Sequence, residues 1–329
     1  MKNKNPHKGG KEFPEPKFEE LSRSEGEDDE SYQPSREEDD LDESGGLKKV
    51  LVTGSRGQLG IELLRVIPPD FEVAGVDLEE MDITNPDDVL SCFYLHRPDI
   101  VIHSAAMTDV EGCETKPEEA FRVNGMGTQN IVAAAREFNA VMLYLSTDYV
   151  FNGEKSTPYL EFDQPDPINV YGMSKLMGEM NVREVLNRFF IVRTSWLIGK
   201  GKNFVRTILN LAKERRELRV VDDQVGKPTF AADLALALKS LVNTPFFGTY
   251  HVTNSGETSW FKLAEKVIEI AGLNAKVVPI RTQEYPTKAR RPKNSSLANA
   301  SFEVRNLFKM PNWEESLKAY LKDEGFKLK

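Results

Sequence analysis

Lys49-Val-Leu-Val-Thr-Gly-Ser-Arg-Gly-Gln-Leu-Gly60 is the stretch that decides the fold. Its first five residues form a short, β-branched apolar run, which predicts a buried strand. The glycines that follow, Gly54, Gly57 and Gly60, form a turn that leads directly into a helical stretch over residues 61–67. A strand, a glycine turn and a helix in this order are typical of a parallel sheet covered by helices.

Strands and helices alternate along most of the chain. The sequence predicts strands at 71–76, 99–103, 141–145 and 189–193, and helices at 86–94, 117–139 and 170–186. This pattern predicts an α/β fold with a Rossmann-like, doubly wound parallel sheet and helices on both faces. After about residue 200 the pattern loosens, with helices around 203–216, 231–242 and 259–271 and short strands at 218–221, 248–252 and 276–280.

This change of pattern divides the predicted body of the protein in two. We expect a dinucleotide-binding Rossmann domain over residues 47–200. A smaller C-terminal substrate-binding lobe is expected over residues 201–329, with parts that return to the Rossmann sheet. Such a lobe should cover the carboxyl ends of the sheet strands, where ligands bind in open α/β folds.

The charge of the chain is concentrated at its N-terminus. The formal net charge is −9, and residues 1–46 hold fifteen acidic and seven basic residues with almost no branched apolar ones. Such a stretch cannot bury enough apolar surface to offset its ordering entropy, so we expect a disordered acidic tail. The remaining residues are nearly neutral, so they offer no basic field for nucleic acid.

Cysteine usage and apolar content exclude other classes of protein. The only cysteines are Cys92 and Cys113, and neither belongs to a C-x-x-C motif or a Cys/His cluster. We expect reduced intracellular thiols and predict no metal site. No apolar run approaches the roughly 20 residues that cross a bilayer, and the N-terminus lacks the apolar core of a signal peptide. We therefore expect a cytoplasmic protein with a small-molecule substrate and no membrane partner.

The glycine turn is expected to hold a dinucleotide. The first glycine makes the tight turn, the second lets the backbone approach a pyrophosphate, and the third allows close packing of helix on strand. The start of the helix adds free N–H groups and the positive end of its dipole. The predicted cofactor-binding residues in this turn are Gly54, Gly57, Gln58, Leu59 and Gly60.

The choice between NADH and NADPH stays open. Asp77 follows the second predicted strand, and an acid there accepts hydrogen bonds from a ribose 2′-OH and repels a 2′-phosphate. Arg56, in the turn itself, offers a positive charge to a 2′-phosphate. Further cofactor contacts are predicted at two loops, from Asp82 and Ile83 and from Ala105, Ala106 and Thr108.

A tyrosine and a lysine have the spacing of a catalytic pair. Tyr171-Gly-Met-Ser-Lys175 places both side chains on one face of a predicted helix. The ammonium is expected to lower the phenol pKa from about 10 towards neutral pH, and the lysine also hydrogen-bonds the nicotinamide ribose. Thr147 follows a predicted strand and is expected to hold the substrate oxygen while Tyr171 donates a proton. Thr147, Tyr171 and Lys175 are the predicted catalytic residues.

The strings around these residues resemble the dTDP-4-dehydrorhamnose reductases, a family of the extended short-chain dehydrogenases. The narrowest are Leu145-Ser-Thr-Asp-Tyr-Val-Phe-Asn-Gly153 and Asp223-Gln-Val-Gly-Lys-Pro-Thr229, and the resemblance covers residues 48–328. It implies NAD(P)H-dependent reduction of the C4 keto group of dTDP-4-dehydro-L-rhamnose to dTDP-L-rhamnose, a precursor of cell-surface polysaccharide. It also implies a monomer or a homodimer. The substrate-binding residues that it implies are Val110, Thr147, Asp148 and Trp196.

Two other functions fit the same motifs. The regulatory subunit of methionine adenosyltransferase has this fold and similar cofactor motifs, and an acidic tail suits a partner-binding protein. The joint presence of Thr147, Tyr171, Lys175 and Trp196 favours an intact sugar site over this reading. The other possibility is a reductase or epimerase that acts on another nucleotide sugar. Trp196 and the loop at residues 291–297 would decide between that function and the reduction of dTDP-4-dehydro-L-rhamnose.

Overall fold

The computed structural model describes residues 46–67 and 71–326. The acidic tail predicted for residues 1–46 lies, apart from Gly46, outside the described residues. From Gly46 onward the chain forms one compact unit, and the division at residue 200 stays a prediction. Within the described part of the chain, no helix combines the length and the apolar character that crossing a membrane requires.

A six-stranded parallel sheet forms the centre of this unit. Its strands are β1 (Lys49–Thr53), β2 (Glu72–Val76), β3 (Ile100–His103), β4 (Val141–Thr147), β5 (Phe189–Thr194) and β10 (Gly248–His251). Their order across the sheet is β10-β5-β4-β3-β1-β2, and every neighbouring pair is parallel. The predicted parallel sheet is confirmed. The strand near residue 248 pairs with β5 in the central sheet, so it is a part of the C-terminal region that returns to that sheet.

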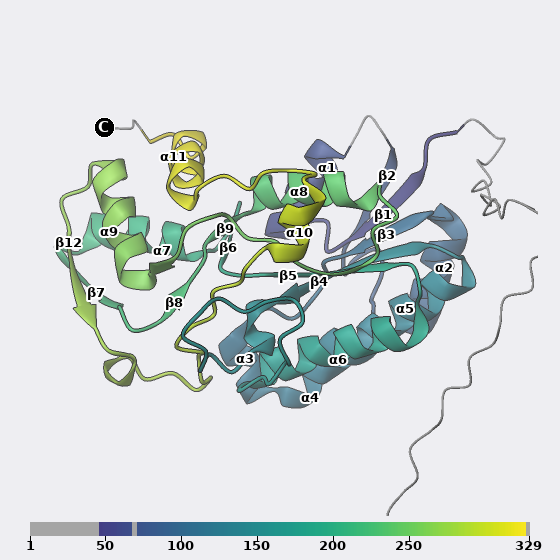
Figure 1. Ribbon diagram of the computed structural model, residues 1–329, viewed down its shortest axis with the longest axis horizontal. Coiled ribbons are helices and arrows are strands. Elements are labelled where there is room, and N and C mark those ends of the chain that lie inside the picture. Colours follow the sequence, from purple (N-terminus) through teal and green to yellow (C-terminus); the bar gives the residue numbers. More distant parts are fainter. Residues whose placement is uncertain (1–45, 68–70, 327–329) are drawn as a thin grey trace, which may run out of the picture. The chain divides into compact units, whose positions relative to one another are not determined.

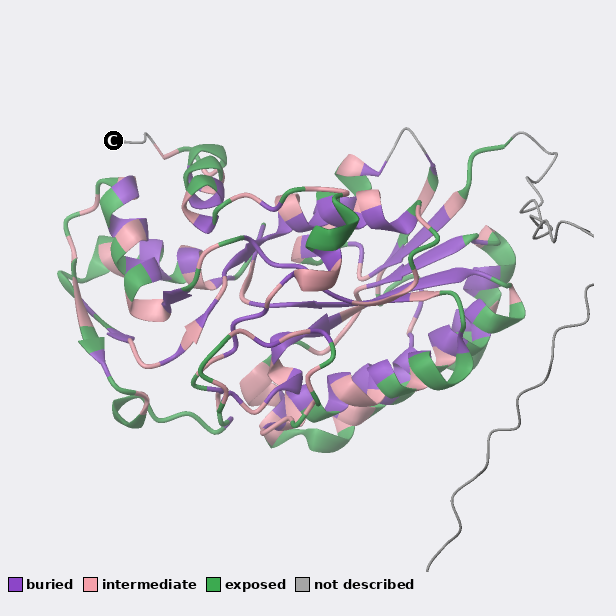
Figure 2. Ribbon diagram, in the orientation of Figure 1, coloured by how far each residue is buried: buried purple, intermediate pink, exposed green. Residues whose placement is uncertain are grey.

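Helices cover both faces of the sheet, as Figure 1 shows. One face carries α1 (Gln58–Val66), α8 (Ala231–Val242) and α10 (Ala300–Arg305), and the other carries α2 (Pro86–His96), α5 (Thr128–Glu137) and α6 (Val170–Val185). Successive side chains of a strand point to opposite faces. Val50 and Val52 therefore join the first core, whereas Leu51 joins the second. The inner strands of the sheet are buried on both sides (Figure 2), which is why runs such as Val50–Val52 and Ile100–Ile102 are continuously apolar.

The long helix predicted over residues 117–139 is interrupted. It begins as α4 (Pro117–Ala120), continues as the π-helix η1 (Phe121–Gly127) and ends as α5. The glycines of the π-helical segment allow close packing, since a Cβ on Gly125 would lie 2.5 Å from the Met177 sulfur of α6. Isolated π-helical turns are often found at functional sites.

The C-terminal lobe has a core of its own. It contains α7 (Phe204–Glu214), α9 (Trp260–Ala271) and α11 (Trp313–Asp323), with the parallel pair β7 (Glu217–Val221) and β12 (Lys276–Ile280). Two shorter pairs join β6 (Leu197–Ile198) to β9 (Thr229–Phe230) and β8 (Val225–Gly226) to β11 (Thr258–Ser259). The short elements, together with α3 (Val110–Thr115), η2 (Asp148–Val150), η3 (Thr282–Glu284), α10 and α11, were not predicted. Most of them are too short to show a hydrophobic period.

The order of the strands determines where a ligand can bind. β1 lies between β2 and β3, so the chain leaves β1 towards one edge of the sheet and returns on its other side. In open α/β sheets, ligands bind outside the carboxyl ends of the strands at this point of reversal. The glycine turn after β1 and the loops after β2 and β3 meet there.

The packing of α8 on the sheet can be tested with two leucines of that helix. Leu238 is fully buried in the core shared with α1, whereas Leu236 is 41% exposed. We expect Leu238→Ala to lower the free energy of unfolding by about 2–5 kcal/mol, because it leaves a cavity in a packed core. Leu236→Ala should cost less than about 1 kcal/mol. Urea unfolding of both variants measures the difference, and equal losses would contradict this placement of the helix.

Candidate active site

A cleft of about 540 Å³ lies at the carboxyl ends of β1, β2 and β3. It is lined by every predicted cofactor-binding residue that lies outside α6: Gly54, Gly57, Gln58, Leu59, Gly60, Asp77, Asp82, Ile83, Ala105, Ala106 and Thr108. Met81, Val123, Leu145 and Leu197 also line it and were not predicted. The structure thus brings together predicted residues that follow three different strands, and their contact with a cofactor stays a prediction.

The glycine turn has the geometry of a phosphate cradle. Gly54 has a φ of +69°, and a Cβ there would lie 2.8 Å from the Ala105 backbone nitrogen. A Cβ on Gly60 would lie 2.2 Å from the Gly54 carbonyl oxygen, so only glycine lets the helix start this close to the turn. No side chain caps α1 at Gly57. Its first N–H groups, which a helix leaves without internal partners, are therefore available to the pyrophosphate of a dinucleotide.

Acidic residues surround the arginine of the turn. Asp77 Oδ2 accepts a hydrogen bond from the Arg56 backbone N–H at 2.9 Å, and Asp77 Oδ1 accepts one from the Leu78 N–H at 2.9 Å. The Arg56 guanidinium pairs with Glu79 at 2.7 Å and also with Glu80. The positive charge that the sequence offered to a 2′-phosphate is therefore already paired with two carboxylates.

Three of the predicted residues meet between the end of β4 and the start of α6. The Thr147 hydroxyl donates a hydrogen bond to Asp148 Oδ1 at 3.0 Å, and it also lowers the pKa of the Tyr171 phenol against the effect of burial. Asn169 fixes the start of α6, because its Oδ1 accepts a hydrogen bond from the Gly172 N–H at 2.8 Å. The structure thus places a phenol beside a hydroxyl at the carboxyl edge of the sheet.

Burial dominates the electrostatics of the Tyr171 and Lys175 pair. It raises the pKa of the Tyr171 phenol above its ordinary value, although the hydrogen bond with Thr147 acts in the opposite direction. The net shift in the pKa of Tyr171 is therefore opposite to the one expected, because desolvation is its largest cause. A lowering of this pKa by Lys175 stays a prediction. Burial lowers the pKa of Lys175 itself to about 7, against an opposing effect of the Glu179 carboxylate. The Lys175 ammonium also lies 4.2 Å from the centroid of the Tyr144 ring.

Asp148 is an unusual carboxyl group. It is buried, and burial raises its pKa to about 7 in spite of hydrogen bonds with Ser295 and Thr147. Its Oδ2 atom has no hydrogen-bond partner in the described part of the chain. A buried polar atom without a partner is rare in folded proteins and is often found at a ligand site.

Two further predicted residues lie on elements beside this group. Trp196 has a φ of +46° and stacks on Trp260, with ring centroids 3.5 Å apart and ring planes at 9°. A Cβ on Gly226 would lie 2.5 Å from the Trp196 indole, so that glycine makes room for the ring. Val110 begins α3, which packs against α6. Contact of Val110 or Trp196 with a substrate stays a prediction.

Sequence reasoning missed a buried ion pair next to the predicted catalytic residues. Glu179 of α6 accepts hydrogen bonds from Arg193 of β5 at 2.8 and 2.7 Å, and from the Ser146 hydroxyl of β4 at 2.6 Å. Glu179 and Arg193 are both almost fully buried. The sequence signal for this pair was Arg193, which follows an apolar predicted strand. An arginine in that position indicates a buried acidic partner, because arginine is rarely buried alone.

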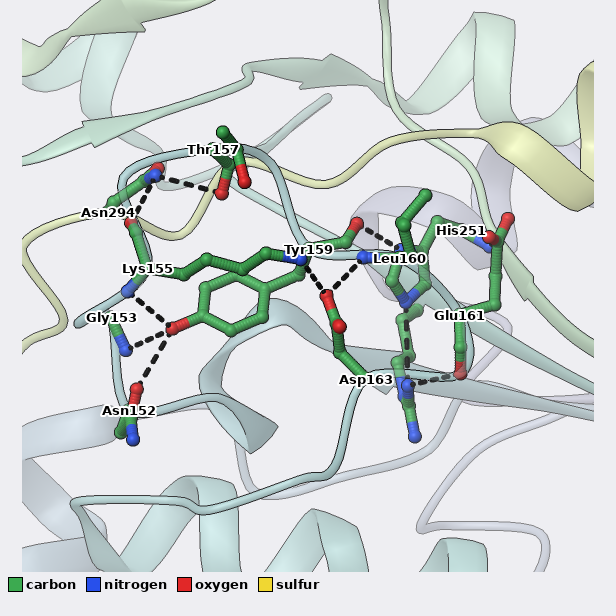
Figure 3. A network of polar contacts seen from close by, with 11 residues as sticks. Asn152, Gly153, Lys155, Thr157, Tyr159, Leu160, Glu161, Asp163, His251 and Asn294 are labelled. Atoms are coloured by element: carbon green, nitrogen blue, oxygen red, sulfur yellow. Dashed lines mark hydrogen bonds and ion pairs between the residues drawn. The ribbon is translucent and has the colours of Figure 1, made fainter.

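A second network holds a C-terminal segment against residues 152–163, where Asn294 Nδ2 donates hydrogen bonds to the Lys155 and Thr157 carbonyls (Figure 3). The Tyr159 hydroxyl donates a hydrogen bond to Asn152 Oδ1 at 2.9 Å, and the Tyr159 backbone N–H donates one to the Ser296 carbonyl at 2.8 Å. The preceding residue, Ser295, is the one that hydrogen-bonds Asp148. The network therefore positions a partner of the candidate site from far along the chain.

Among the residues that the structure describes, the cysteines and the acidic side chains form no cluster suited to a metal ion. Cys92 and Cys113 are free and buried, and burial raises the pKa of each thiol to about 11. In the described ranges 46–67 and 71–326, no group of three His, Cys, Asp or Glu residues is placed to hold a metal ion.

Comparison with known proteins identifies relatives over the whole body of the chain. A family model described as RmlD substrate binding domain matches residues 48–325. The spore coat polysaccharide biosynthesis protein SpsK of Bacillus subtilis is 40% identical over 281 residues, which are 85% of this chain and 99% of that protein. A dTDP-4-dehydrorhamnose reductase of Sinorhizobium fredii is 40% identical over 280 residues, which are 82% of this chain and 95% of that one.

A solved structure extends the likeness to three dimensions. The crystal structure of a dTDP-4-dehydrorhamnose reductase from Bacillus anthracis, in complex with NADP, is 41% identical and has a TM-score of 0.82. The match covers 84% of this chain and 99% of that one.

The buried ion pair yields a stability prediction with an internal control. Glu179 contacts two arginines, of which Arg193 is buried and Arg183 is 42% exposed. We expect Arg193→Met to lower the free energy of unfolding by about 3–5 kcal/mol, because it leaves a buried carboxylate without its main partner. Arg183→Met should cost at most about 1 kcal/mol, since the exposed pair is screened by solvent. Similar losses in urea unfolding would contradict the dominance of the buried pair.

The raised pKa of Asp148 predicts a pH dependence of stability. The unfolded carboxyl group ionises near its ordinary pKa of 3.8, whereas the folded one holds its proton up to about 7. The native state binds more protons in this window, so the contribution of Asp148 to the free energy of unfolding falls as pH rises from about 4 to about 7. Asp148→Asn cannot ionise, so its stability relative to the unmodified protein should increase across the same window.

Urea unfolding at several pH values between about 4 and 8 measures this difference. Asp166→Asn makes the same chemical change at an exposed carboxylate and is the control, for which we expect no comparable trend. If the curves of the Asp148→Asn variant and the unmodified protein run parallel, the buried carboxyl group does not have the pKa assigned to it.

Proposed function

The chain belongs to the family described as RmlD substrate binding domain, and we propose that it is a dTDP-4-dehydrorhamnose reductase. In this reaction NADH or NADPH reduces the C4 keto group of dTDP-4-dehydro-L-rhamnose to the alcohol of dTDP-L-rhamnose. The observation that carries the proposal is the placement of Thr147, at the carboxyl end of β4, and Tyr171, in the first turn of α6, on the sheet edge that also forms the glycine-lined cleft.

The residues present fit a nicotinamide dinucleotide. The uncapped start of α1 suits the pyrophosphate, and the carboxylate of Asp77 suits a ribose hydroxyl. When bound, the cofactor supplies the hydride for C4. The cleft reaches Leu145 of β4, the strand that ends at Thr147. It also reaches Leu197 of β6, which directly follows Trp196.

The acid–base work falls to the Thr147, Tyr171 and Lys175 group. The hydroxyls of Thr147 and Tyr171 orient the C4 oxygen, and Tyr171 donates its proton to that oxygen as negative charge develops there. A phenol with a raised pKa keeps its proton at neutral pH, which suits the direction of reduction. The ammonium of Lys175 holds the nicotinamide ribose and stabilises the phenolate that remains.

The substrate side is built from Asp148, Trp196 and Val110. A protonated Asp148 donates a hydrogen bond to a sugar oxygen, and the Trp196 ring gives the sugar an apolar wall. We also propose a cytoplasmic location, since both cysteines are free thiols.

Turnover by the Tyr171→Phe variant tests the proposed acid. We expect the turnover rate to fall by about 10²–10⁴-fold, because the phenylalanine has no proton to donate. The binding of the reduced cofactor should be nearly unchanged. Oxidation of NADH and NADPH is followed by absorbance, with dTDP-4-dehydro-L-rhamnose formed in situ. Tyr94→Phe, which removes an exposed hydroxyl bonded to Glu137, is the control that should keep full activity.

Two outcomes would overturn parts of this proposal. Full turnover by Tyr171→Phe would remove Tyr171 from the role of acid. If the unmodified protein binds the cofactor but reduces no dTDP-4-keto sugar, the reductase assignment fails.

A further inference from the structure

The tryptophan that follows β5 has a strained backbone. Trp196 adopts a φ of +46°, a left-handed conformation in which a bulky side chain is a clear outlier. Such a conformation persists only where the surroundings determine it, and it is often found where a ligand binds. At this residue the chain passes from β5 of the central sheet to β6 of the C-terminal lobe. The strain therefore lies at the junction between the sheet and the lobe.

Three contacts hold Trp196 in this conformation. Its carbonyl accepts a hydrogen bond from the Thr229 backbone N–H at 3.2 Å. Its ring stacks on the Trp260 ring, with centroids 3.5 Å apart and planes at 9°. The ring also lies so close to Gly226 that a Cβ there would be 2.5 Å from it. All three partners belong to the C-terminal lobe, so the lobe determines where the indole lies.

The two residues that touch the indole are joined by one short ladder. β8 and β11 pair antiparallel, with Gly226 opposite Thr258. Trp260 directly follows β11 as the first residue of α9, and the side chain of Ser259 caps the start of that helix. Gly226 and Trp260 therefore reach the Trp196 ring as one unit.

The same unit also contacts the segment that reaches Asp148. The Val225 backbone N–H of β8 donates a hydrogen bond to the Lys293 carbonyl at 2.7 Å, and the Ser295 backbone N–H donates one to the Val225 carbonyl at 2.8 Å. Ser295 lies beside Asp148, since its side chain lowers the pKa of that carboxyl group against the effect of burial. The pair of β8 and β11 is thus linked to two groups on the substrate side, Trp196 and Asp148.

We propose that Trp260 is a positioning residue of the sugar site, which holds the Trp196 ring where it contacts the sugar. The inference rests on the proposed function in that it takes Trp196 as a wall of that site. Both tryptophans are half-buried, so the stack fixes the Trp196 ring while part of that ring stays open to a ligand. Without the stack, the left-handed turn loses a main support and the ring takes up several orientations.

The test compares the binding of dTDP-L-rhamnose with the binding of dTDP, which lacks the sugar. Titration calorimetry on the full chain, with the reduced cofactor present so that no turnover occurs, gives both Kd values for the unmodified protein and for Trp260→Leu. We expect the variant to raise the Kd of dTDP-L-rhamnose by about 3–10-fold, which corresponds to the loss of one aromatic stack. The Kd of dTDP should stay unchanged.

Two further variants separate the stack from the fold of the lobe. Trp260→Phe keeps a flat ring and should recover most of the affinity for dTDP-L-rhamnose. Phe261→Leu changes the next residue of α9, which packs against the core of the same lobe, and should leave the ratio of the two Kd values unchanged. In steady-state turnover, Trp260→Leu should raise the KM for the dTDP-4-keto sugar more than it lowers kcat, because the proposed proton donor is untouched.

A second measurement follows the Trp196 ring without any sugar. The chain has three tryptophans, so a ¹⁵N-labelled sample gives three indole N–H signals in a proton–nitrogen NMR spectrum, and Trp196→Phe identifies the signal of Trp196. We expect that signal to be sharp in the unmodified protein and in Trp260→Phe. In Trp260→Leu it should broaden or split, because the ring exchanges between orientations.

A single sharp Trp196 signal in Trp260→Leu would overturn the inference. So would an unchanged Kd of dTDP-L-rhamnose in that variant, or an equal rise in the Kd of dTDP. The proposed function fails separately: a protein that reduces no dTDP-4-keto sugar contradicts it, whereas the NMR spectra still decide whether Trp260 holds the Trp196 ring.

Discussion

The buried ion pair of Glu179 and Arg193 is the interaction on which the geometry of the site depends. It joins α6 to β5, and the Ser146 hydroxyl adds β4 to the same carboxylate. Thr147 follows Ser146 on β4, and Lys175 precedes Glu179 by one helical turn. Because the pair is out of solvent, its hydrogen bonds must stay satisfied, which restricts how far α6 can slide on the sheet. The strand that carries the hydroxyl and the helix that carries the phenol are thereby held in one register.

Desolvation explains the ionisable groups around this pair. It lowers the pKa of Lys175, raises that of Tyr171 and raises that of Asp148, and in each case burial is the largest cause. All three shifts favour the neutral form, as the loss of hydration requires. Burial disfavours the charged forms of these groups in the free protein. It also strengthens any charge-assisted hydrogen bond that forms there, because water does not screen it. A site of this kind responds strongly to the charge that develops on a substrate oxygen.

Local signals predicted most of the fold and about half of the residues that line the cleft. The strand, glycine turn and helix at residues 49–66 are set by neighbouring residues, so their pattern can be read from the sequence alone. The π-helical turn at η1 depends on how α6 packs against Gly125, and the pairing of Arg56 with Glu79 and Glu80 depends on a turn more than twenty residues away. Trp260, which stacks on Trp196, belongs to the C-terminal lobe and has no motif of its own. These contacts join segments that are distant in sequence, so no period or spacing reveals them.

The distribution of buried polar groups bears on the choice between an enzyme and a binding protein. A protein that only binds a dinucleotide needs the glycine turn and the cleft, which lie around β1, β2 and β3. It does not need a buried Asp148 with an unpaired oxygen, a desolvated Lys175, or a buried ion pair under them. Replacing such groups with apolar residues of similar volume is often neutral or stabilising. Their concentration at the ends of β4 and β5 and on α6, next to Thr147 and Tyr171, therefore favours chemistry at that place over cofactor binding alone.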